Sequence, residues 1–135
     1  MSSLERLKAA YKAWDECKGL RPEIWLDLLA DTVHIQSLGG EAQPLAFARN
    51  RKSKAEVVQY FAGLAQHWTM VHWTPQTFVT EGDKIAVFAT CGWTNKATGK
   101  TVETPSAHLW QFENGYATSM IELFDSARVM AAATP

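Results

Sequence analysis

The sequence predicts an α+β domain in which three N-terminal helices close a cone-shaped, strongly curved antiparallel sheet (an α+β barrel). Two observations support this prediction. Apolar residues in the first half recur at helical spacing behind capping signals, and from about residue 70 onward they alternate with a period of two. The chain has 135 residues, enough to bury one core and too few for two. Residues 1–135 are therefore expected to form a single domain.

The first helix is predicted from its start signal and its apolar face. Ser2 and Glu5 form an S-x-x-E capping box. The apolar positions that follow, which include Tyr11 and Trp14, lie on one side of a helix. Gly19 is expected to end it, because glycine readily adopts the left-handed conformation that terminates helices.

Two more helices and a strand are predicted before residue 67. Pro22 suits the first turn of a short second helix, with residues 24, 25, 28 and 29 turned inward. A short strand over residues 33–38 should follow, and then a long loop over residues 39–52. Ser53 and Glu56 form a second capping box, which opens a third helix through about Gln66.

The second half is predicted to be four strands, over residues 70–80, 84–95, 101–112 and 116–125. The turn sequences EGD, KATG and ENG separate them, and strands joined by such short turns pair antiparallel. The last residues, DSARVMAAATP, are expected to form a capped final turn of helix.

Composition excludes several classes of function. The formal net charge of −1 provides no basic surface for nucleic acid or for an anionic membrane. No apolar run approaches the ~18–20 residues of a membrane span, and the first residues do not resemble a secretion signal. The two cysteines and four histidines show no metal-ligand spacing, so neither a metal nor a disulfide framework is expected. These features favour a cytoplasmic protein.

His108 and Glu122 interrupt the aromatic pattern of the last two strands, and the turn between them decides whether they meet. If residues 113–115 form a three-residue loop, His108 lies opposite Met120 and diagonal to Glu122 on one face. If Asn114 and Gly115 alone form a two-residue turn, Glu122 moves to the other face. Asn-Gly favours the shorter turn, so the residues alone leave both registers open.

The same counting predicts which side chains share the face of His108. Val87 is placed opposite His108 if residues 96–99 form a four-residue loop, and Trp73 joins this face if residues 81–83 form a three-residue loop. The predicted wall consists of Trp73, Cys91, Trp93, Trp110, Phe112 and Phe124. The opposite face, with Ala107, Leu109, Ala117, Ser119 and Ile121, is suited to packing against a second subunit.

The chain resembles the nuclear transport factor 2-like superfamily, and within it the SnoaL-like polyketide cyclases and the ketosteroid isomerases. Four segments, spread over almost the whole length, carry the resemblance: YKAWDECKGLRPEIWLDLLADTVHIQSLGG, KSKAEVVQYFAGL, EGDKIAVFATCGWTNKATGK and HLWQFENGYATSMIELFD. The resemblance implies the cone-shaped fold and a homodimer formed through the sheet. It also implies the longer turn in the last hairpin, which brings His108 and Glu122 together.

The resemblance also implies roles for single residues. In the polyketide cyclases a carboxylate on the last strand acts as acid and base beside a histidine on the preceding strand, and Glu122 and His108 match those positions. The catalytic aspartate of the ketosteroid isomerases matches Gln36, which cannot take a proton. Their oxyanion-binding acid matches His108, and their tyrosine donor matches Tyr11.

These inferences predict an enzyme without metal or organic cofactor that shuttles a proton on a small hydrophobic carbonyl or ring-containing molecule, as an isomerase, cyclase or dehydratase does. Burial should raise the pKa of Glu122 and a protonated His108 should lower it, so that the pair titrates as a unit near neutrality. The catalytic residues are predicted to be Glu122, His108 and Tyr11. The expected substrate contacts are Trp14, His34, Gln36, Trp73, Cys91, Trp93, Trp110 and Phe124. The alternative is a non-catalytic module for ligand binding or dimerisation.

Overall fold

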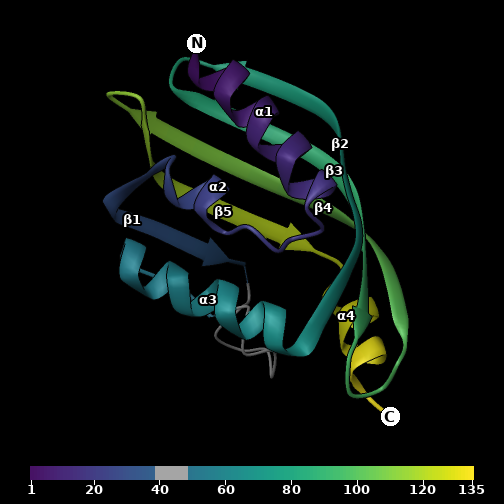
Figure 1. The fold of residues 1–135 in the computed structure, drawn as a ribbon. Coiled ribbons are helices and arrows are strands. Elements are labelled where there is room, and N and C mark those ends of the chain that lie inside the picture. Colours follow the sequence, from purple (N-terminus) through teal and green to yellow (C-terminus); the bar gives the residue numbers. More distant parts are fainter. Residues whose placement is uncertain (39–48) are drawn as a thin grey trace.

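The computed structural model describes residues 1–38 and 49–135, which form helices packed on one curved sheet (Figure 1). In chain order the elements are α1 (Ser3–Glu16), α2 (Glu23–Leu26), β1 (Leu29–Ser37), α3 (Lys54–His67), β2 (Trp68–Glu81), β3 (Lys84–Asn95), β4 (Thr101–Glu113), β5 (Tyr116–Phe124) and α4 (Ser126–Ala133). The predicted α+β class and the four-stranded meander are confirmed. The first part of the predicted loop, residues 39–48, lies outside the described residues.

The sheet has the order β1-β5-β4-β3-β2 and is mixed. Strands β2 to β5 pair antiparallel, as predicted, whereas β1 pairs parallel to β5. The parallel strand was not predicted, because β1 and its partner are separated by most of the chain and no turn sequence links them. β1 and β2 are the two edges, so the curved sheet is not closed into a complete barrel.

One strand connection, that between β2 and β3, is tighter than predicted. Glu81 pairs with Lys84 across a two-residue turn, where the sequence analysis assumed three residues. A bulge between Pro75 and Thr77 shifts the register by one residue, so Trp73 still lies opposite Cys91, on the predicted face. The two-residue turn is favoured because Gly82 has a positive φ of 57°.

Two hydrogen bonds fasten α1 across the concave face of the sheet. Near its start Arg6 donates to the carbonyl of Gly115 in the β4–β5 turn. Near its end Asp15 accepts from the backbone N–H of Trp73 on β2 at 2.8 Å. The capping box of Ser2 and Glu5 forms as predicted, with both reciprocal bonds in place. These contacts fix which side of α1 faces the sheet.

The other helices differ in detail from the prediction. α2 is a single turn, and β1 begins at Leu29, earlier than expected, because Leu29 already pairs with Ala117. The Ser53 side chain caps α3, but Glu56 accepts from the N–H of Lys52 and so completes only half of the predicted box. α4 extends over two turns rather than one.

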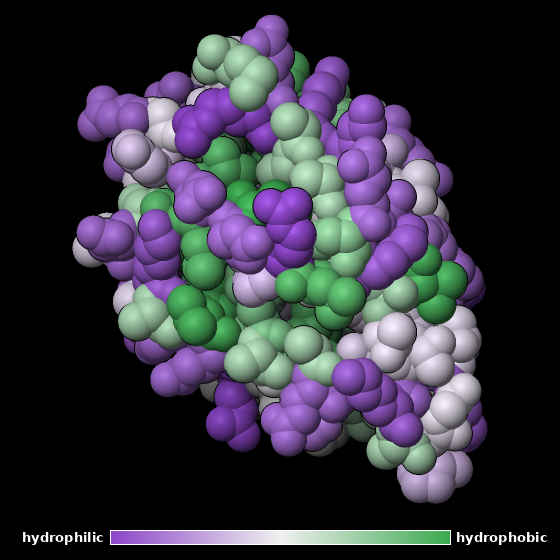
Figure 2. Space-filling model, in the orientation of Figure 1, coloured by the Kyte–Doolittle hydropathy of each residue, from purple (hydrophilic) through white to green (hydrophobic). Residues whose placement is uncertain are grey.

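The core lies between the concave face of the sheet and the helices. Its main cluster joins α1 and α2 to the middle of the sheet, and a smaller cluster joins α3 and α4 to the ends of β2 and β4. On the face that carries the helices, hydrophobic residues show between hydrophilic ones (Figure 2). No helix in the described part of the chain has the length and hydrophobicity needed to cross a membrane.

Candidate functional site

A cavity lies between the two core clusters, under α1, α2, α3 and α4 and above the concave face of the sheet. Its volume is about 90 Å³. Since one water needs ~10–15 Å³ by this measure, the space equals roughly half a dozen waters or a flat molecule of one or two rings. Apolar side chains make up most of the wall.

All six tryptophans of the sequence line this cavity. Trp73, Trp93 and Trp110 come from the sheet, and Trp14 comes from α1, as the sequence analysis expected. Trp25 on α2 and Trp68 at the start of β2 complete the set: Trp14, Trp25, Trp68, Trp73, Trp93 and Trp110. Large aromatic rings around an open space are typical of sites for flat apolar ligands.

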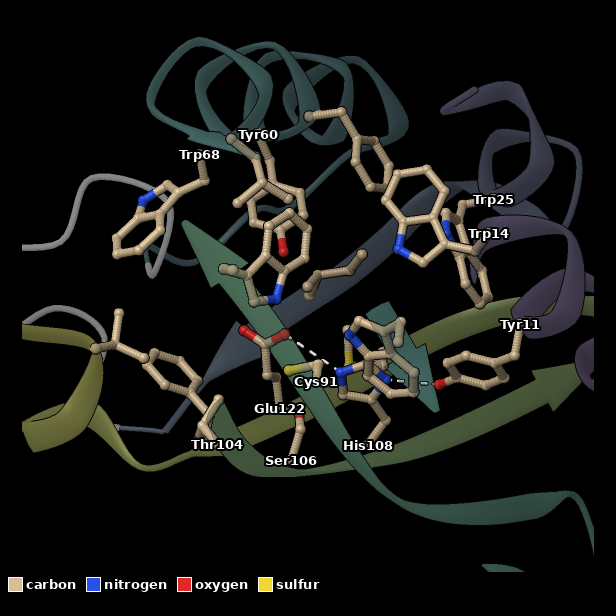
Figure 3. A pocket seen from close by; sticks show the side chains of 18 of the residues that line it. Tyr11, Trp14, Trp25, Tyr60, Trp68, Cys91, Thr104, Ser106, His108 and Glu122 are labelled. Atoms are coloured by element: carbon tan, nitrogen blue, oxygen red, sulfur yellow. Dashed lines mark hydrogen bonds and ion pairs between the residues drawn. The ribbon is translucent and has the colours of Figure 1, made fainter. Parts of the chain in front are cut away.

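A chain of hydrogen bonds crosses the floor of the cavity and ends on Glu122 (Figure 3). The indole N–H of Trp110 donates to the Tyr11 hydroxyl at 2.9 Å, and the Tyr11 oxygen lies 2.6 Å from His108 Nδ1. His108 Nε2 lies 3.2 Å from Glu122 Oε2. Ser37 on β1 donates from its hydroxyl to the other carboxylate oxygen at 2.8 Å.

The partners in this chain determine where each hydrogen lies. An indole N–H can only donate, so the Tyr11 oxygen accepts from Trp110. Among the described residues, His108 Nδ1 is the one acceptor within reach of the Tyr11 hydroxyl, so we assign the hydroxyl hydrogen to that bond. Nδ1 therefore accepts, and Nε2–H donates to the Glu122 carboxylate. Every donor meets an acceptor only if Glu122 is ionised, so the network favours a carboxylate in the cavity wall.

Electrostatics favour the same protonation state. Burial of Glu122 would raise its pKa, but the hydrogen bond from His108, the positive charge that this ring carries when protonated, and the hydrogen bond from Ser37 outweigh it. The pKa of Glu122 thus lies below its ordinary value. The sequence predicted a pair poised near neutrality; the pKa of Glu122 is instead lowered, mainly by His108 and to a smaller extent by Ser37, which was not among the predicted site residues.

Ring stacking holds His108 in place. The imidazole stacks on the indole of Trp73, with ring centres 5.0 Å apart, and Trp73 stacks in turn on the Tyr11 ring at 4.8 Å. The His108 side chain is only 10% exposed and that of Glu122 only 12%. Packing and hydrogen bonding together leave the imidazole little freedom to rotate.

Glu122 reaches this position through a register that neither predicted turn provides. Asn114 and Gly115 form the two-residue turn, both with positive φ, which alone would turn Glu122 to the outer face. A bulge next to Phe112 then shifts the pairing by one residue, and Glu122 lies directly opposite His108 instead of diagonal to it. The two residues share a face as predicted, but for a different reason.

Three predicted positions do not line the cavity. On β1 the inward residues are Val33, Ile35 and Ser37, so His34 is exposed and Gln36 faces away from the cavity. Their expected role as substrate contacts is therefore wrong. Phe112 is buried below the cavity without lining it.

The prediction that Ala117 faces outward is also wrong. Ala117 was expected on the outer face, but it is fully buried because the two-residue turn pairs it with Phe112 on the inner face, before the bulge shifts the register.

Two residues of the site were not singled out from the sequence. The alternation of Val33, Ile35 and Ser37 was a signal for Ser37, since one polar residue ends an inward-facing apolar row. Tyr60 on α3 lines the cavity opposite the sheet (Figure 3). Its hydroxyl makes no hydrogen bond with any described residue.

The remaining polar wall residues are poorly suited to nucleophilic or metal chemistry. Burial raises the pKa of the Cys91 thiol to about 12, so the thiol stays protonated. Ser106 and Thr104 donate to backbone carbonyls, those of Leu123 and Pro105. Within residues 1–38 and 49–135, no three His, Cys, Asp or Glu side chains are grouped to hold a metal ion.

A second His–Glu pair lies on the outer face of the sheet. His72 Nε2 lies 2.7 Å from Glu103 Oε2, but the Glu103 side chain is 58% exposed. Gly92, on the strand between them, makes room for the pair, since a Cβ there would lie 2.5 Å from a Glu103 oxygen. The pair lies outside the cavity and provides a matched control for Glu122.

Comparison with known proteins places the chain in a family. The family model described as "SnoaL-like domain" matches residues 7–120. No curated protein matches the sequence.

Solved structures of similar fold cover nearly the whole chain. A nuclear transport factor 2-like (NTF2-like) protein of unknown function from Burkholderia pseudomallei has a TM-score of 0.86 and 24% identity, with 100% of both chains covered. TerC, co-crystallised with polyporic acid, has a TM-score of 0.81 and 20% identity, with 97% of each chain covered. A protein with a ketosteroid isomerase-like fold from Catenulispora acidiphila, in complex with trimethylamine, has a TM-score of 0.77 and 19% identity, covering 97% of this chain and 98% of the other.

Proposed function

The chain belongs to the SnoaL-like domain family, and on this premise we propose that it is a small cofactor-free enzyme that moves a proton on a hydrophobic carbonyl or ring-containing molecule. The reaction is an isomerisation, cyclisation or dehydration. The observation that carries the proposal is the Glu122 carboxyl group, held by His108 and Ser37 in the wall of an aromatic cavity. A carboxylate in a dry site beside a flat ligand is suited to general-base catalysis.

Each member of the hydrogen-bond chain has a role in this proposal. Glu122 takes a proton from a carbon next to the carbonyl group and returns it at another position. His108 orients the carboxylate through its Nε2–H, and Tyr11 holds the imidazole in that tautomer through Nδ1. A carboxylate base needs no strongly raised pKa, provided that the site stabilises the enolate it creates.

The cavity defines the class of substrate. Its indole walls favour a flat molecule, and its size restricts the reacting part to one or two rings. The negative charge of Glu122, the one carboxylate among the described residues of the wall, also disfavours an acidic group close to the reacting carbon. The co-crystal of TerC with polyporic acid supports the idea that this fold accommodates an organic ligand.

The test is the exchange of hydrogen for deuterium at the carbon next to the carbonyl of 2-tetralone, a flat two-ring ketone. NMR in D₂O follows the exchange with the unmodified protein, Glu122→Gln and Glu103→Gln. General-base catalysis contributes about 10²–10⁴-fold, so we expect Glu122→Gln to lose at least a hundredfold while Glu103→Gln keeps the full rate. Exchange by Glu122→Gln at the unmodified rate, or no acceleration by the unmodified protein, would contradict the proposal.

A second candidate function is binding without catalysis. This alternative is favoured because both nitrogens of His108 and both oxygens of Glu122 already have hydrogen-bond partners within the protein. In that case 2-tetralone would quench the tryptophan fluorescence equally in the unmodified protein and in Glu122→Gln, with no exchange in either.

We also propose that two copies associate through the outer face of the sheet. Phe88, Ala107 and Leu123 are paired in one row across β3, β4 and β5, and Ala86, Leu109 and Ile121 are paired in the next. Phe88 is 51% exposed and Leu123 is 47% exposed. A contiguous apolar patch of this kind marks an interface. Sedimentation should show a dimer that Phe88→Glu converts to a monomer; a monomeric unmodified protein would contradict this.

A further inference from the structure

In the hydrogen-bond chain that ends on Glu122, no hydroxyl group is left to donate a hydrogen bond to the substrate. Removal of a proton beside a carbonyl sends the C–H electron pair into a new C=C bond, and the π electrons of the C=O bond move to its oxygen. That oxygen then carries negative charge and needs a hydrogen-bond donor. The resemblance to the ketosteroid isomerases suggested Tyr11, but its hydrogen is directed to His108, and its side chain is fully buried.

The other hydroxyl groups in the wall are also committed. Thr104 donates to the carbonyl of Pro105, and Ser106 donates to that of Leu123. Ser37 donates to Glu122 itself. Each already has an acceptor within the protein, so none is free to meet a ligand oxygen without breaking an existing bond.

Tyr60 is the exception. It projects from α3 toward the sheet, and in Figure 3 its hydroxyl points into the cavity on the side of Glu122. Neither Glu122 nor any other described residue forms a hydrogen bond with it, although both side chains line the same cavity. The ring is held against Phe61, with centres 5.1 Å apart, and it packs on the cluster of α3 and α4.

The electrostatic setting keeps this hydroxyl protonated. Burial, and after it the negative charge of Glu122, raises the pKa of Tyr60 well above its usual value. A phenol of this kind donates a hydrogen bond and does not give up its proton. Tyr60 and Glu122 both line the same cavity.

We propose that Tyr60 is the donor that binds the substrate's carbonyl oxygen, across the cavity from the carboxylate that takes the proton. This inference rests on the proposed function and adds the second half of the reaction: Glu122 acts at the carbon and Tyr60 at the oxygen. The substrate class is then a neutral cyclic ketone or enol whose oxygen points toward α3. Return of the proton from Glu122 to carbon restores the C=O bond and both starting groups.

The test compares Tyr60→Phe with Tyr116→Phe, which removes the same hydroxyl from an exposed tyrosine at the β4–β5 turn. In the 2-tetralone exchange assay, Tyr60→Phe should lower kcat by about 10²-fold, the usual effect of removing one oxyanion donor, with KM changed little. Tyr116→Phe should match the unmodified protein. Tyr60→Phe with an unchanged kcat would overturn the inference.

A binding measurement separates failure of this inference from failure of the proposed function. Binding of 2-naphthol, whose hydroxyl resembles that of the enol of 2-tetralone, is followed by quenching of tryptophan fluorescence. Loss of the Tyr60 hydroxyl should weaken binding by about tenfold, the effect of one net hydrogen bond of ~1.4 kcal/mol. If no variant exchanges 2-tetralone, this arm alone decides: tenfold weaker binding supports Tyr60 as the donor, and unchanged binding overturns it.

Discussion

Replacing Tyr11 with phenylalanine removes one oxygen atom and separates the two halves of the hydrogen-bond chain. The aromatic ring and its stacking on Trp73 remain, but the indole N–H of Trp110 loses its acceptor and His108 Nδ1 loses its donor. Both groups are buried, and each one left unpaired costs about 1–3 kcal/mol. The loss in the free energy of unfolding should therefore be about 2–6 kcal/mol.

The assay is urea denaturation followed by circular dichroism, with Tyr60→Phe as the matched control. Both substitutions remove a hydroxyl that contacts the cavity, but the Tyr60 hydroxyl has no partner among the described residues. We expect Tyr60→Phe to change the free energy of unfolding by less than about 0.5 kcal/mol, the usual range where no specific feature is lost. Equal free energies of unfolding for the two variants would refute the assignment of hydrogen bonds around Tyr11.

Three further predictions follow from the same contacts. Ser37→Ala removes a hydrogen bond to a charged group. It should cost about 1–2 kcal/mol of unfolding free energy and raise the pKa of Glu122, which NMR titration of the labelled carboxyl would show. An unchanged pKa of Glu122 would count against a role for Ser37. Gly115→Ala forces a side chain into the left-handed region at φ 81°. It should lower the free energy of unfolding, measured in urea, by about 1 kcal/mol. An unchanged free energy of unfolding would contradict the two-residue turn. The folded-state pKa of Glu122 is lowered, so the stability contributed by its charge is present above the unfolded value of ~4.3 and is lost as pH falls through the folded value. In urea denaturation, the difference in unfolding free energy between the unmodified protein and Glu122→Gln should therefore shrink below about pH 4. A difference that grows there would be inconsistent with a lowered pKa.

Local patterns predicted the elements better than they predicted the pairing between them. Capping residues and periodicity located α1, α3 and the four strands of the meander, because those signals lie within a few neighbouring residues. The parallel addition of β1 to β5 depends on contacts between segments far apart in the sequence. Nothing in residues 29–37 alone indicates which strand edge they will occupy.

In the candidate site, too, local patterns predicted more than the pairing between strands could. Alternation along β2, β3 and β4 predicted that Trp73, Cys91, Trp93, Trp110 and His108 share one face, and all of them line the cavity. The position of Glu122 required a bulge beside Phe112, which no residue type announces, and it was reached only because the family resemblance placed it next to His108. Ser37 and Tyr60 escaped notice because their importance depends on what lies across the cavity.

The proposed role of Glu122 as the general base is tested most directly by comparing two pKa values. One is the pKa of the Glu122 carboxyl in the free protein, measured by carbon NMR; the other is the pKa that governs the fall of kcat/KM for 2-tetralone exchange at acid pH. The proposal predicts that the two values agree and lie below the ordinary value for glutamate. Exchange that persists at a pH where the NMR signal shows Glu122 protonated would contradict it.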